Sequence, residues 1–528
     1  MASYEGEREA RPEISPSEIE LEKLIGEGTF GKVYRGKCRG KEVAVKVFKR
    51  ADLSEDDLKA FKEEVKIMSK IVHPNIVLFL GACVKGDEYR IVTDLMPKDL
   101  ETLFLKEGAK GLSQYDRLKM LKHAALGMNW LHCSNPVFIH RDLKLSNLLV
   151  DNDYKVYVCD FGLTQMKPKD VNSLEYDPHG SPLYMAPEVF VGEYDEKCDI
   201  YSFGVIMWEA ITLTQAYAGI SENLPAFIHS VVDLHERPEI PGNVNSSLRD
   251  LMADCWAPEP KDRPSFSTII ERLDKCLVDL AIRSRQGRKF WKKKKFFGKE
   301  EVGWKTFEKE LRSTLQRQEK DPHNDVALKC LRAVLADDPK KKLGKEKVVV
   351  NILKFGKILD WFGPFEEDSN DEDFLDRLEN MLRMKWFHGD ISTPKATDRL
   401  NGLETGTFLV RFSSSAPGCY TISSVDKKGR VVHQRITYTP KKGFEFWNNH
   451  YDTLQNLIAG EKKQHNLLTP CQNSPYAHLF PSDEEEFESF SQAGCYVVSG
   501  SEPANQFAPP ASESSKPKKE KKKKRSKE

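Results

Sequence analysis

The pattern of apolar and polar residues predicts alternating helices and strands in the first half of the chain. From Leu58 to Met68, apolar residues recur every three or four positions, which is the spacing of one helical face. Farther along, apolar runs at 146–150 and 154–159 predict two short strands, and turn-forming Asp and Asn residues lie between them. A hairpin of these strands would bring the residues on either side of it close together.

Helical spacing also fills much of the region 300–385. Three segments show it, at 305–318, 326–338 and 347–362. They predict a small helical connector packed against the unit that follows it. In the same region the acidic stretch 368–376 has the composition of a calcium loop, but it lacks the glycine that such loops need at their sixth position. A solvated acidic turn is therefore expected there.

Length and composition are those of a soluble multidomain protein. The 528 residues have room for two or three domains, and a hydrophobic content of 39% suits globular units. The eleven cysteines form no CxxC pair, which indicates thiols in a reducing compartment. The N-terminus is polar and no apolar run reaches the roughly 18 residues of a membrane helix. We therefore expect a cytoplasmic protein without a secretion signal or a membrane span.

Charge is unevenly distributed, although the formal net charge is zero. The segment 283–299 is densely basic and contains no acid. Three interpretations stay open for it: binding to anionic lipid, nuclear import, and a solvated linker. Its aromatic residues favour the membrane surface, because they could enter the interface. These residues are Phe290, Trp291, Phe296 and Phe297. The lysine-rich tail beyond about 500 is expected to be disordered.

The strongest chemical signal is the pair of motifs HRDLKLSN at 140–147 and DFG from Asp160. Phosphoryl transfer needs a carboxylate that orients the attacking hydroxyl, and oxygen ligands that hold Mg²⁺ against the nucleotide phosphates. Asp142, Asn147 and Asp160 supply these three oxygens, and the predicted hairpin would bring the last two together. The alternative is an ordinary surface hairpin that is acidic but has no catalytic role. Further motifs around this pair argue against that alternative.

The sequence IGEGTFGKV at 25–33 predicts a glycine-rich loop whose backbone amides can approach phosphate. Alone it could equally open a dinucleotide-binding fold, but no αβ crossover with a ribose-binding acid follows. A strand ending VAVK at 43–46 follows instead, at the spacing of a strand that carries a phosphate-binding lysine. Lys46 would contact the nucleotide phosphates. It needs an anionic partner, and Glu63 and Glu64 both lie near the edge of the predicted helix face, with a solvated helix glutamate as the alternative for Glu64.

Together these motifs resemble the eukaryotic protein kinase family, over about residues 20–280. The resemblance implies a two-lobed kinase fold that uses ATP and Mg²⁺. It implies that Asp142 and Lys144 are catalytic and that Asn147 and Asp160 bind the metal. It also favours Glu64 over Glu63 as the partner of Lys46, because Raf-like kinases carry their ion-pair glutamate just before the valine of a similar run. It also implies ATP binding by Ile25, Gly26, Glu27, Gly28, Thr29, Phe30, Gly31, Lys32, Val33, Ala44, Lys46, Glu64 and the gatekeeper Thr93. All of these motifs are intact, which argues against an inactive kinase fold.

Two positions indicate which hydroxyl is phosphorylated. Lys144, two residues past Asp142, could neutralise charge on the transferring phosphoryl group. Ser181 stands where serine/threonine kinases place a hydroxyl that bridges to that lysine and aspartate. The segments 73–83 and 255–266 resemble the tyrosine-kinase-like branch, which contains the Raf and mixed-lineage kinases. Members of that branch sometimes phosphorylate tyrosine as well. We expect mainly serine/threonine activity, with tyrosine as a secondary acceptor.

The segment from Asp160 to Glu188 resembles a kinase activation segment. Its candidate phosphorylation sites are Thr164, Ser173 and Tyr176. Phosphate on one of them is expected to order the segment by pairing with basic residues such as Arg141. The resemblance implies structural roles for two further residues: Asp199 holds the catalytic loop, and Arg263 pairs with Glu188.

A second group of motifs occupies residues 386–470. A helix is predicted over 393–403, and GTFLVRFSSS at 406–415 alternates as a strand does. The alternation places Phe408, Val410 and Phe412 on one face and Leu409, Arg411 and Ser413 on the other. An arginine in such an apolar strand is costly unless an anion pairs with it, and a bidentate guanidinium suits phosphate. A structural salt bridge is the alternative for Arg411.

This region resembles the phosphotyrosine-binding SH2 domain, a central antiparallel sheet flanked by two helices. The resemblance implies phosphotyrosine binding by Arg411, Ser413, His433 and Arg435, with a core histidine as the alternative for His433. One departure is Thr393, where many SH2 domains have a second phosphate-binding arginine, for which Arg435 could substitute. Gln434 replaces the aromatic residue of Src-type domains, so their peptide preference does not transfer.

A kinase followed by a C-terminal SH2 domain resembles the Shk family of SH2-containing kinases from social amoebae, across essentially the whole chain. We expect a multidomain α+β protein. Its predicted parts are an N-terminal extension 1–19, a kinase domain 20–280, a basic segment and helical connector 281–385, an SH2 domain 386–480, and an acidic patch with a disordered tail 481–528. The expected partners are protein substrates, phosphotyrosine-containing proteins and an anionic membrane surface, but not nucleic acid. The competing function is that of a signalling scaffold with weak or no kinase activity.

Overall fold

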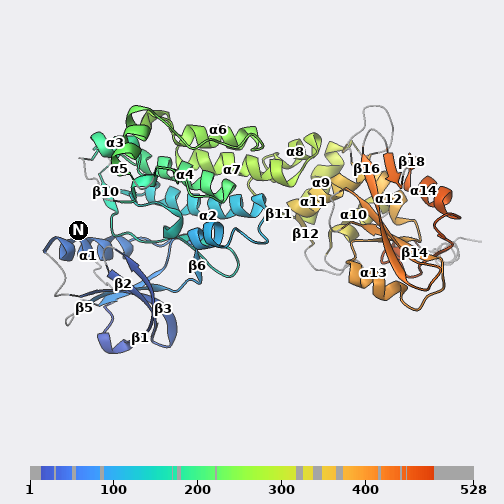
Figure 1. Cartoon of the computed structure of the whole chain (residues 1–528), viewed down its shortest axis with the longest axis horizontal. Helices are drawn as coiled ribbons and strands as arrows, with labels where there is room; N and C mark the ends of the chain where they lie inside the picture. Colours follow the sequence, from blue (N-terminus) through green and yellow to red (C-terminus); the bar gives the residue numbers. More distant parts are fainter. Residues whose placement is uncertain are drawn as a thin grey trace, which may run out of the picture.

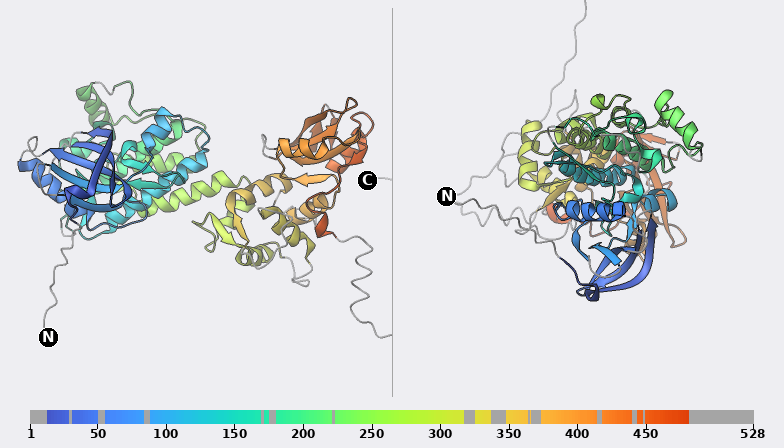
Figure 2. Two further views of the ribbon diagram at one scale, coloured as in Figure 1. Left: turned by 90° about the horizontal axis from the view of Figure 1, so that it is seen from below. Right: turned by 90° about the vertical axis from the view of Figure 1, so that its left-hand side faces the viewer.

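The computed structural model contains two folded units with a connector between them (Figures 1 and 2). The small and large lobes of the first unit, drawn blue to green, lie at one end, and the orange unit lies at the other. The structure describes residues 13–28, 31–49, 55–83, 88–168, 171–174, 180–220, 223–316, 325–336, 348–363, 365, 373–413, 418–439, 443–447 and 449–480.

A five-stranded antiparallel sheet forms the small lobe, with the strand order β1-β2-β3-β5-β4. The strands are β1 Ile19–Gly28, β2 Gly31–Cys38, β3 Lys41–Lys49, β4 Phe79–Cys83 and β5 Glu88–Asp94. Helix α1 (Glu55–Met68) packs on this sheet through the predicted apolar face. The ring of Phe61 lies 5.3 Å from that of Phe48 on β3. A Cβ at Gly31 would lie 2.7 Å from the Val47 carbonyl oxygen, so the approach of β2 to β3 requires glycine.

The large lobe is mostly helical. Its helices are α2 Gln114–Cys133, α3 Pro187–Val191, α4 Lys197–Thr212, α5 Leu224–Ile228, α6 Ser246–Cys255 and α7 Phe266–Ala281, and its strands are β6 Lys98–Asp99, β7 Val137–Ile139, β8 Leu148–Val150, β9 Val156–Val158 and β10 Gln165–Lys167. The predicted hairpin is confirmed, because β8 pairs antiparallel with β9, although both strands are shorter than expected. It brings together its two flanks, since the Cys159 backbone N–H donates to the Asn147 carbonyl at 3.0 Å.

The connector combines helices with a two-stranded sheet. Its elements are α8 Arg285–Trp291, β11 Glu301–Gly303, α9 Trp304–Thr314, α10 Val326–Leu335, β12 Val349–Asn351, α11 Ile352–Phe362 and α12 Phe374–Leu382. The helices expected in 305–318 and 326–338 are confirmed. The helix expected over 347–362 is partly wrong, because Val349–Asn351 pairs with β11 as a strand. Consecutive valines favour a strand wherever a partner strand is available.

The acidic stretch also differs from the expectation at its C-terminal end. Asp373 caps α12, and its carboxylate accepts hydrogen bonds from the backbone N–H groups of Leu375 at 2.8 Å and Asp376 at 3.3 Å. Asp376 in turn accepts from the Asp373 N–H at 3.1 Å, which completes a capping box. A solvated turn is therefore wrong for these residues, while 368–372 lie outside the described residues.

Three of the four aromatic residues of the basic segment belong to the core, and the fourth, Phe297, is only partly buried. Phe290 is 1% exposed, and Trp291 and Phe296 are 0% exposed. The ring of Phe290 lies 5.5 Å from Phe307, and that of Trp291 lies 5.7 Å from Phe355. Insertion of these three side chains into a membrane interface, which favoured the lipid interpretation, is therefore wrong.

Several lysines of this segment also have acidic partners. Lys292 Nζ lies 2.7 Å from Asp279, and Lys293 and Lys295 lie 3.3 and 2.9 Å from Glu310. These contacts partly neutralise the basic segment within the protein. Among the described residues, no helix is long and apolar enough to cross a bilayer.

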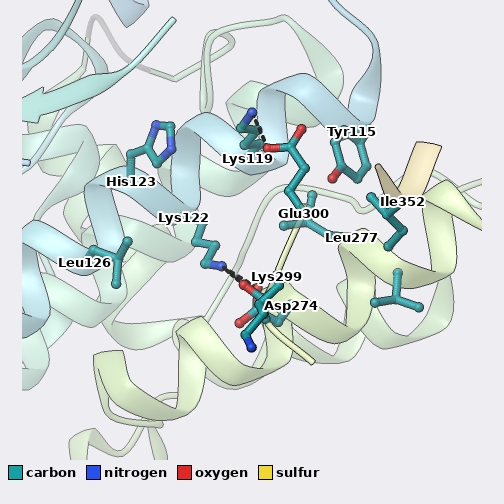
Figure 3. A pocket seen from close by; sticks show the side chains of 12 residues that line it. Tyr115, Lys119, Lys122, His123, Leu126, Asp274, Leu277, Lys299, Glu300 and Ile352 are labelled. Carbon is teal, nitrogen blue, oxygen red and sulfur yellow. Dashed lines mark hydrogen bonds and ion pairs between the residues drawn. The ribbon is translucent and has the colours of Figure 1, made fainter. Parts of the chain in front are cut away.

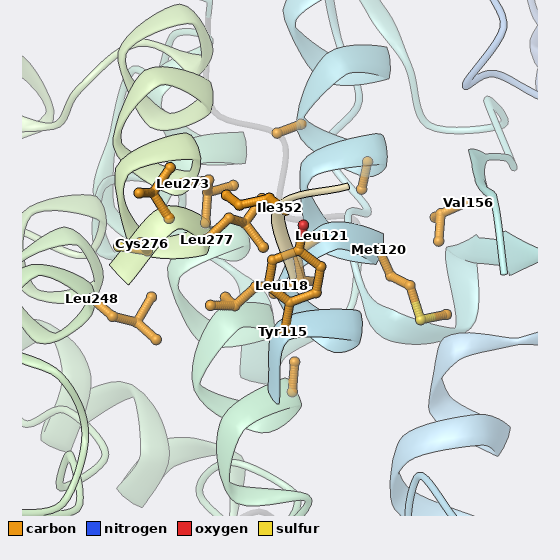
Figure 4. Packing of buried hydrophobic residues seen from close by; sticks show 14 of the residues in the cluster. Tyr115, Leu118, Met120, Leu121, Val156, Leu248, Leu273, Cys276, Leu277 and Ile352 are labelled. Carbon is orange, nitrogen blue, oxygen red and sulfur yellow. The ribbon is translucent and has the colours of Figure 1, made fainter. Parts of the chain in front are cut away.

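One apolar core extends from the large lobe through the connector into the C-terminal unit. Ile352, the first residue of α11, lies beside Leu277 of α7 (Figure 4). At the other end of α11, Trp361 stacks on Phe412, with ring centroids 3.6 Å apart and planes inclined by 10°. The Tyr420 hydroxyl donates to the Trp361 carbonyl at 3.0 Å. The expected packing of the connector against the C-terminal unit is therefore confirmed.

A cavity of about 160 Å³ lies where α2 and α7 meet the connector (Figure 3). Polar contacts cross this junction. Lys119 Nζ lies 2.6 Å from Glu300 of the connector, and Lys122 Nζ lies 2.6 Å from Asp274. Lys122 also donates to the Gly298 carbonyl at 3.3 Å. The contacts to Glu300 and Gly298 join the connector to α2, whereas the contact to Asp274 joins α2 to α7 within the large lobe.

Gly356→Ala is expected to destabilise the full chain by about 1–3 kcal/mol, the usual cost of overpacking. A Cβ at this position would lie 2.0 Å from the Ala281 carbonyl oxygen, so α11 would have to move away from α7. Urea unfolding measures the effect. Gly303→Ala in the same connector is the matched control, because a Cβ there meets nothing within 4 Å. Unchanged stability of Gly356→Ala would contradict the close packing of these helices.

The C-terminal unit is a mainly antiparallel sheet, with strands ordered β13-β14-β15-β16-β17-β18 and β19 paired with β14. Its elements are β13 Phe387–Gly389, α13 Thr393–Leu400, β14 Thr407–Phe412, β15 Tyr420–Val425, β16 Val431–Thr439, β17 Gly443–Phe446, β18 Asn449–Tyr451, α14 Leu454–Glu461 and β19 Thr469–Pro470. The alternation predicted for β14 is confirmed. Phe408 and Phe412 belong to the large core, whereas Leu409 packs in a separate cluster with Leu400 of α13.

Candidate active site and phosphate-binding site

Lys46 on β3 is the centre of an ion-pair network between the lobes. Its Nζ lies 3.0 and 3.1 Å from the two carboxylate oxygens of Glu64 on α1, and 3.0 Å from Asp160 Oδ1, which follows β9. The ion pair expected between Lys46 and Glu64 is therefore present. Glu64 is only 5% exposed, so the alternative of a solvated helix glutamate is wrong.

The network sets the charges of its members. Burial opposes the charged form of Lys46, but the carboxylates of Glu64 and Asp160 outweigh it and raise the lysine's pKa. Burial likewise opposes ionisation of Asp160, but the charge of Lys46 outweighs it and lowers that pKa. Burial raises the pKa of Glu64. At neutral pH, Lys46 is therefore a cation and Asp160 an anion.

Asp142 lies in a compact set of hydrogen bonds in the catalytic loop. Its carboxylate accepts from Ser181 Oγ at 2.8 Å and from Asn147 Nδ2 at 3.0 Å, and lies 2.8 Å from Lys144 Nζ. Lys144 Nζ also donates to Ser181 Oγ at 2.7 Å. The structure thus brings together the lysine, serine and aspartate that the sequence suggested would meet. Within the described residues, the amide oxygen of Asn147 accepts no hydrogen bond.

A buried carboxylate holds this loop from below. Asp199, which is 0% exposed, accepts from the backbone N–H groups of His140 and Arg141, each at 2.9 Å. Elsewhere in the lobe, Arg263 donates to the two oxygens of Glu188 at 2.5 and 2.8 Å. Both structural roles expected from the sequence are confirmed.

The residues expected to line the nucleotide lie on adjacent strands of the small lobe. Ile25, Gly26, Glu27 and Gly28 end β1, while Gly31, Lys32 and Val33 begin β2. Across the sheet, Val33 is opposite Lys46, and Ala44 is opposite Thr93. Thr29 and Phe30, at the tip of the loop, lie outside the described residues.

The three candidate phosphorylation sites of the activation segment differ in their surroundings. Thr164 is 8% exposed, so its hydroxyl is largely buried in this conformation, and its phosphorylation stays a prediction. Ser173 is partly exposed, and its hydroxyl donates to Glu193. Tyr176 lies outside the described residues. Arg141, the expected partner of a phosphate, lies over the ring of Tyr194 at 5.4 Å.

Arg411 is a buried cation that contacts two backbone carbonyls and one hydroxyl. It is 3% exposed, and its Nη1 donates to the carbonyls of Ile391 and Phe412 at 3.4 and 3.3 Å. Its Nη2 donates to Thr393 Oγ1 at 2.7 Å. Within the described residues it forms no ion pair, so the alternative of a structural salt bridge is not supported there. A buried guanidinium with these contacts retains donors for an anion.

The other expected residues lie around Arg411 on the same sheet. Thr421 lies opposite Arg411 on one side and opposite Arg435 on the other, so the three form a row across β14, β15 and β16. Ser413, 7% exposed, follows β14 directly. His433 is exposed, which argues against a core histidine, and burial of part of its ring, together with Arg411, lowers its pKa.

Sequence reasoning missed the residues that position this histidine. Ser423 Oγ lies 2.8 Å from His433 Nδ1, and Thr397 Oγ1 of α13 lies 3.2 Å from Nε2. Ser423 could have been found, because β15 and β16 pair in a register that places it opposite His433. The contact of Thr397 with His433 depends on where α13 packs against the sheet, which the local sequence does not indicate.

Comparison with protein families gives a match to each unit. The family described as protein tyrosine and serine/threonine kinase matches residues 19–273, and the SH2 domain family matches residues 386–460. The two matches include the Asp142 and Arg411 sites, respectively.

Curated relatives match most of the chain. The dual specificity protein kinase shkC of Dictyostelium discoideum is 46% identical over 466 residues, which cover 87% of this chain and 91% of shkC. The dual specificity protein kinase shkA of the same organism is 41% identical over 488 residues, covering 89% and 91%. The probable serine/threonine-protein kinase SIS8 of Arabidopsis thaliana is 44% identical over 262 residues, covering 49% and 25%. The chain therefore belongs to the family of protein kinases, represented by shkC and shkA, that carry an SH2 domain after the kinase domain.

Proposed function

We propose that this kinase transfers phosphate from ATP mainly to serine and threonine, and that its SH2 domain brings it to phosphotyrosine-containing partners. The observation that carries the proposal is the contact set of Asp142, Lys144 and Ser181. It places a carboxylate and an ammonium group side by side, at 2.8 Å, where an acceptor hydroxyl would approach.

In this proposal two groups act on the reacting atoms. Asp142 orients the acceptor hydroxyl and takes its proton. Lys144 neutralises charge on the transferring phosphoryl group. Ser181 is a positioning residue, because it hydrogen-bonds to both and fixes their separation.

Asn147 and Asp160 would hold Mg²⁺, which when bound neutralises charge on the nucleotide phosphates. Their donor set suits a hard cation, since it offers a carboxylate of lowered pKa and an amide oxygen. Lys46, held by Glu64, would contact the phosphates as a point charge. Residues 25–33, with Ala44 and Thr93, would line the rest of the nucleotide.

The names of the relatives bear on the acceptor. The shkC and shkA proteins are named dual specificity kinases, and SIS8 a serine/threonine kinase. Together with the Lys144–Ser181 contact, these names support serine and threonine as the main acceptors and tyrosine as a secondary one. The competing proposal is a scaffold with weak or no kinase activity. The ion pairs of the site are all formed, so they give that proposal no support.

Phosphoamino-acid analysis of the full chain after incubation with Mg²⁺ and ATP tests this proposal. We expect phosphoserine and phosphothreonine to exceed phosphotyrosine. Ser181→Ala should reduce phosphorylation of serine and threonine by roughly 2- to 10-fold, because it removes hydrogen bonds worth about 0.5–1.5 kcal/mol. Asp160→Asn is the negative control. Predominant phosphotyrosine would overturn the assigned acceptor, and equal incorporation by Asp160→Asn would favour the scaffold.

A further inference from the structure

The hydroxyl of Thr393 lies directly against the arginine proposed to bind phosphotyrosine. At 2.7 Å, the bond from Arg411 Nη2 to Thr393 Oγ1 is shorter than the other contacts of this guanidinium, which are 3.3 and 3.4 Å. The Nε atom of Arg411 is buried and has no hydrogen-bond partner in the described parts of the chain. A buried cation with an unused donor is therefore adjacent to a hydroxyl that a protein kinase could modify.

The surroundings of Thr393 would stabilise a phosphate. Thr393 is the first residue of α13, where the helix dipole and the first-turn amides favour negative charge. It is partly exposed, and Ser392 and Pro394 beside it are exposed, so an enzyme can reach it. Asp390 also acts electrostatically on Arg411, but a phosphate carries about twice the charge of a carboxylate at neutral pH.

We propose that Thr393 is a phosphorylation site and that phosphate on it prevents the SH2 domain from binding phosphotyrosine. The ester oxygen would occupy the position now 2.7 Å from Nη2, so the terminal oxygens lie within reach of the guanidinium fork. One arginine cannot pair fully with two dianions at once. The attached phosphate has the higher effective concentration and therefore excludes the external one. This inference rests on the proposed binding of phosphotyrosine by Arg411.

The reaction needs only the activity of the family to which this chain belongs. The γ-phosphoryl group of ATP moves to Thr393 Oγ1 of a second copy of the chain. A P–O bond forms at Oγ1, the bond between the β-phosphate and the γ-phosphorus breaks, and ADP leaves with the electron pair. The hydroxyl proton passes to the catalytic aspartate of the copy that acts as the enzyme. The kinase would thus turn off its own recruitment.

The first experiment installs phosphothreonine at 393 in the full chain by genetic encoding. Affinity is measured by fluorescence anisotropy with a labelled pool of phosphotyrosine peptides of random flanking sequence. We expect at least a 30-fold loss of affinity relative to the unmodified chain. Phosphothreonine at Thr453, the exposed N-cap of α14 in the same domain, is the matched control and should change the affinity less than threefold.

A second measurement tests the contact itself. In ³¹P NMR titrations, the pKa of the phosphate on Thr393 should lie below that of the phosphate on Thr453, and Arg411→Met should remove the difference. If the unmodified chain does not bind the peptide pool, the proposed role of Arg411 fails. If it binds and the phosphate on Thr393 leaves both affinity and titration unchanged, only the present inference is overturned.

The third measurement tests the source of the phosphate. Mass spectrometry of the full chain after incubation with Mg²⁺ and ATP should detect phosphate on Thr393, and the Asp142→Asn variant alone should show none. Thr393→Val enzyme added to Asp142→Asn should restore the modification, because the added copy has no hydroxyl at 393 and must act on the other copy. Absence of the modification in every sample would overturn the self-regulatory part. The affinity of Thr393→Val, which lacks the hydroxyl, should be the same before and after this treatment, whereas that of the wild-type chain should fall.

Discussion

Asp142→Asn is expected to lower the rate of phosphoryl transfer by roughly 10²–10⁴-fold, the usual contribution of a positioned general base. The side chain keeps its size, but it can no longer accept the proton of the substrate hydroxyl. Its charge, which balances Lys144 at 2.8 Å, is also lost. The measurement is the initial rate of phosphate transfer to a generic protein substrate by the purified full chain.

The control for this substitution is Asp153→Asn, an exposed aspartate in the turn of the β8–β9 hairpin. It makes the same chemical change close to the site, and its rate should stay within twofold of the wild type. Both variants should unfold at the same temperature as the wild type within a few degrees, because neither carboxylate packs in the apolar core. A rate for Asp142→Asn above one tenth of the wild-type rate would contradict the assignment of Asp142 as a catalytic residue.

Arg411→Lys is expected to weaken phosphotyrosine binding by roughly 10- to 100-fold. Lysine keeps the positive charge, but it loses the planar fork that can donate two parallel hydrogen bonds to a phosphate. Hydrogen bonds to charged groups contribute about 1.5–3 kcal/mol each, which corresponds to this range. The sequence offers no second arginine at the start of α13, since Thr393 stands there, so Arg411 should carry an unusually large share of the binding.

This substitution is tested by two measurements on the same full-length protein. Affinity for phosphotyrosine peptides should fall, while the rate of phosphorylation of a peptide in solution should stay the same, because the catalytic groups lie in the other unit. Arg430→Lys, exposed and paired with Asp426, is the control in the same domain. Unchanged affinity would refute the pocket. A parallel fall in the solution rate would mean that the SH2 domain regulates catalysis as well as recruitment.

The sequence was most informative where function requires particular residues at fixed spacing. The motifs around Asp142, Asp160 and Arg411 could be assigned to helices, strands and loops from the sequence alone, because phosphate and metal chemistry restrict the residue types. The Lys46–Glu64 ion pair was also expected, because a lysine that contacts phosphates needs an anionic partner and the resemblance to Raf-like kinases favoured Glu64 over Glu63. These contacts depend on chemistry more than on long-range packing.

Prediction was poorest in the connector, where long-range contacts decide the structure. The aromatics Phe290 and Trp291 stand among lysines, and that local pattern fits a membrane surface as well as a core. Their burial depends on Phe307 and Phe355, which are distant in sequence. Val349–Asn351 likewise becomes a strand only because β11, almost fifty residues earlier, pairs with it. No local pattern contains that information.

The position of Ile352 in the core of the large lobe has a practical consequence for protein production. A truncated form that ended near residue 280, as the match to residues 19–273 would suggest, would lack this side chain and the whole aromatic cluster behind it. The apolar surface of α2 and α7 that α11 now covers would face water, and exposed patches of that kind promote aggregation. A recombinant kinase should therefore extend at least to Phe362, so that α11 still covers this apolar surface.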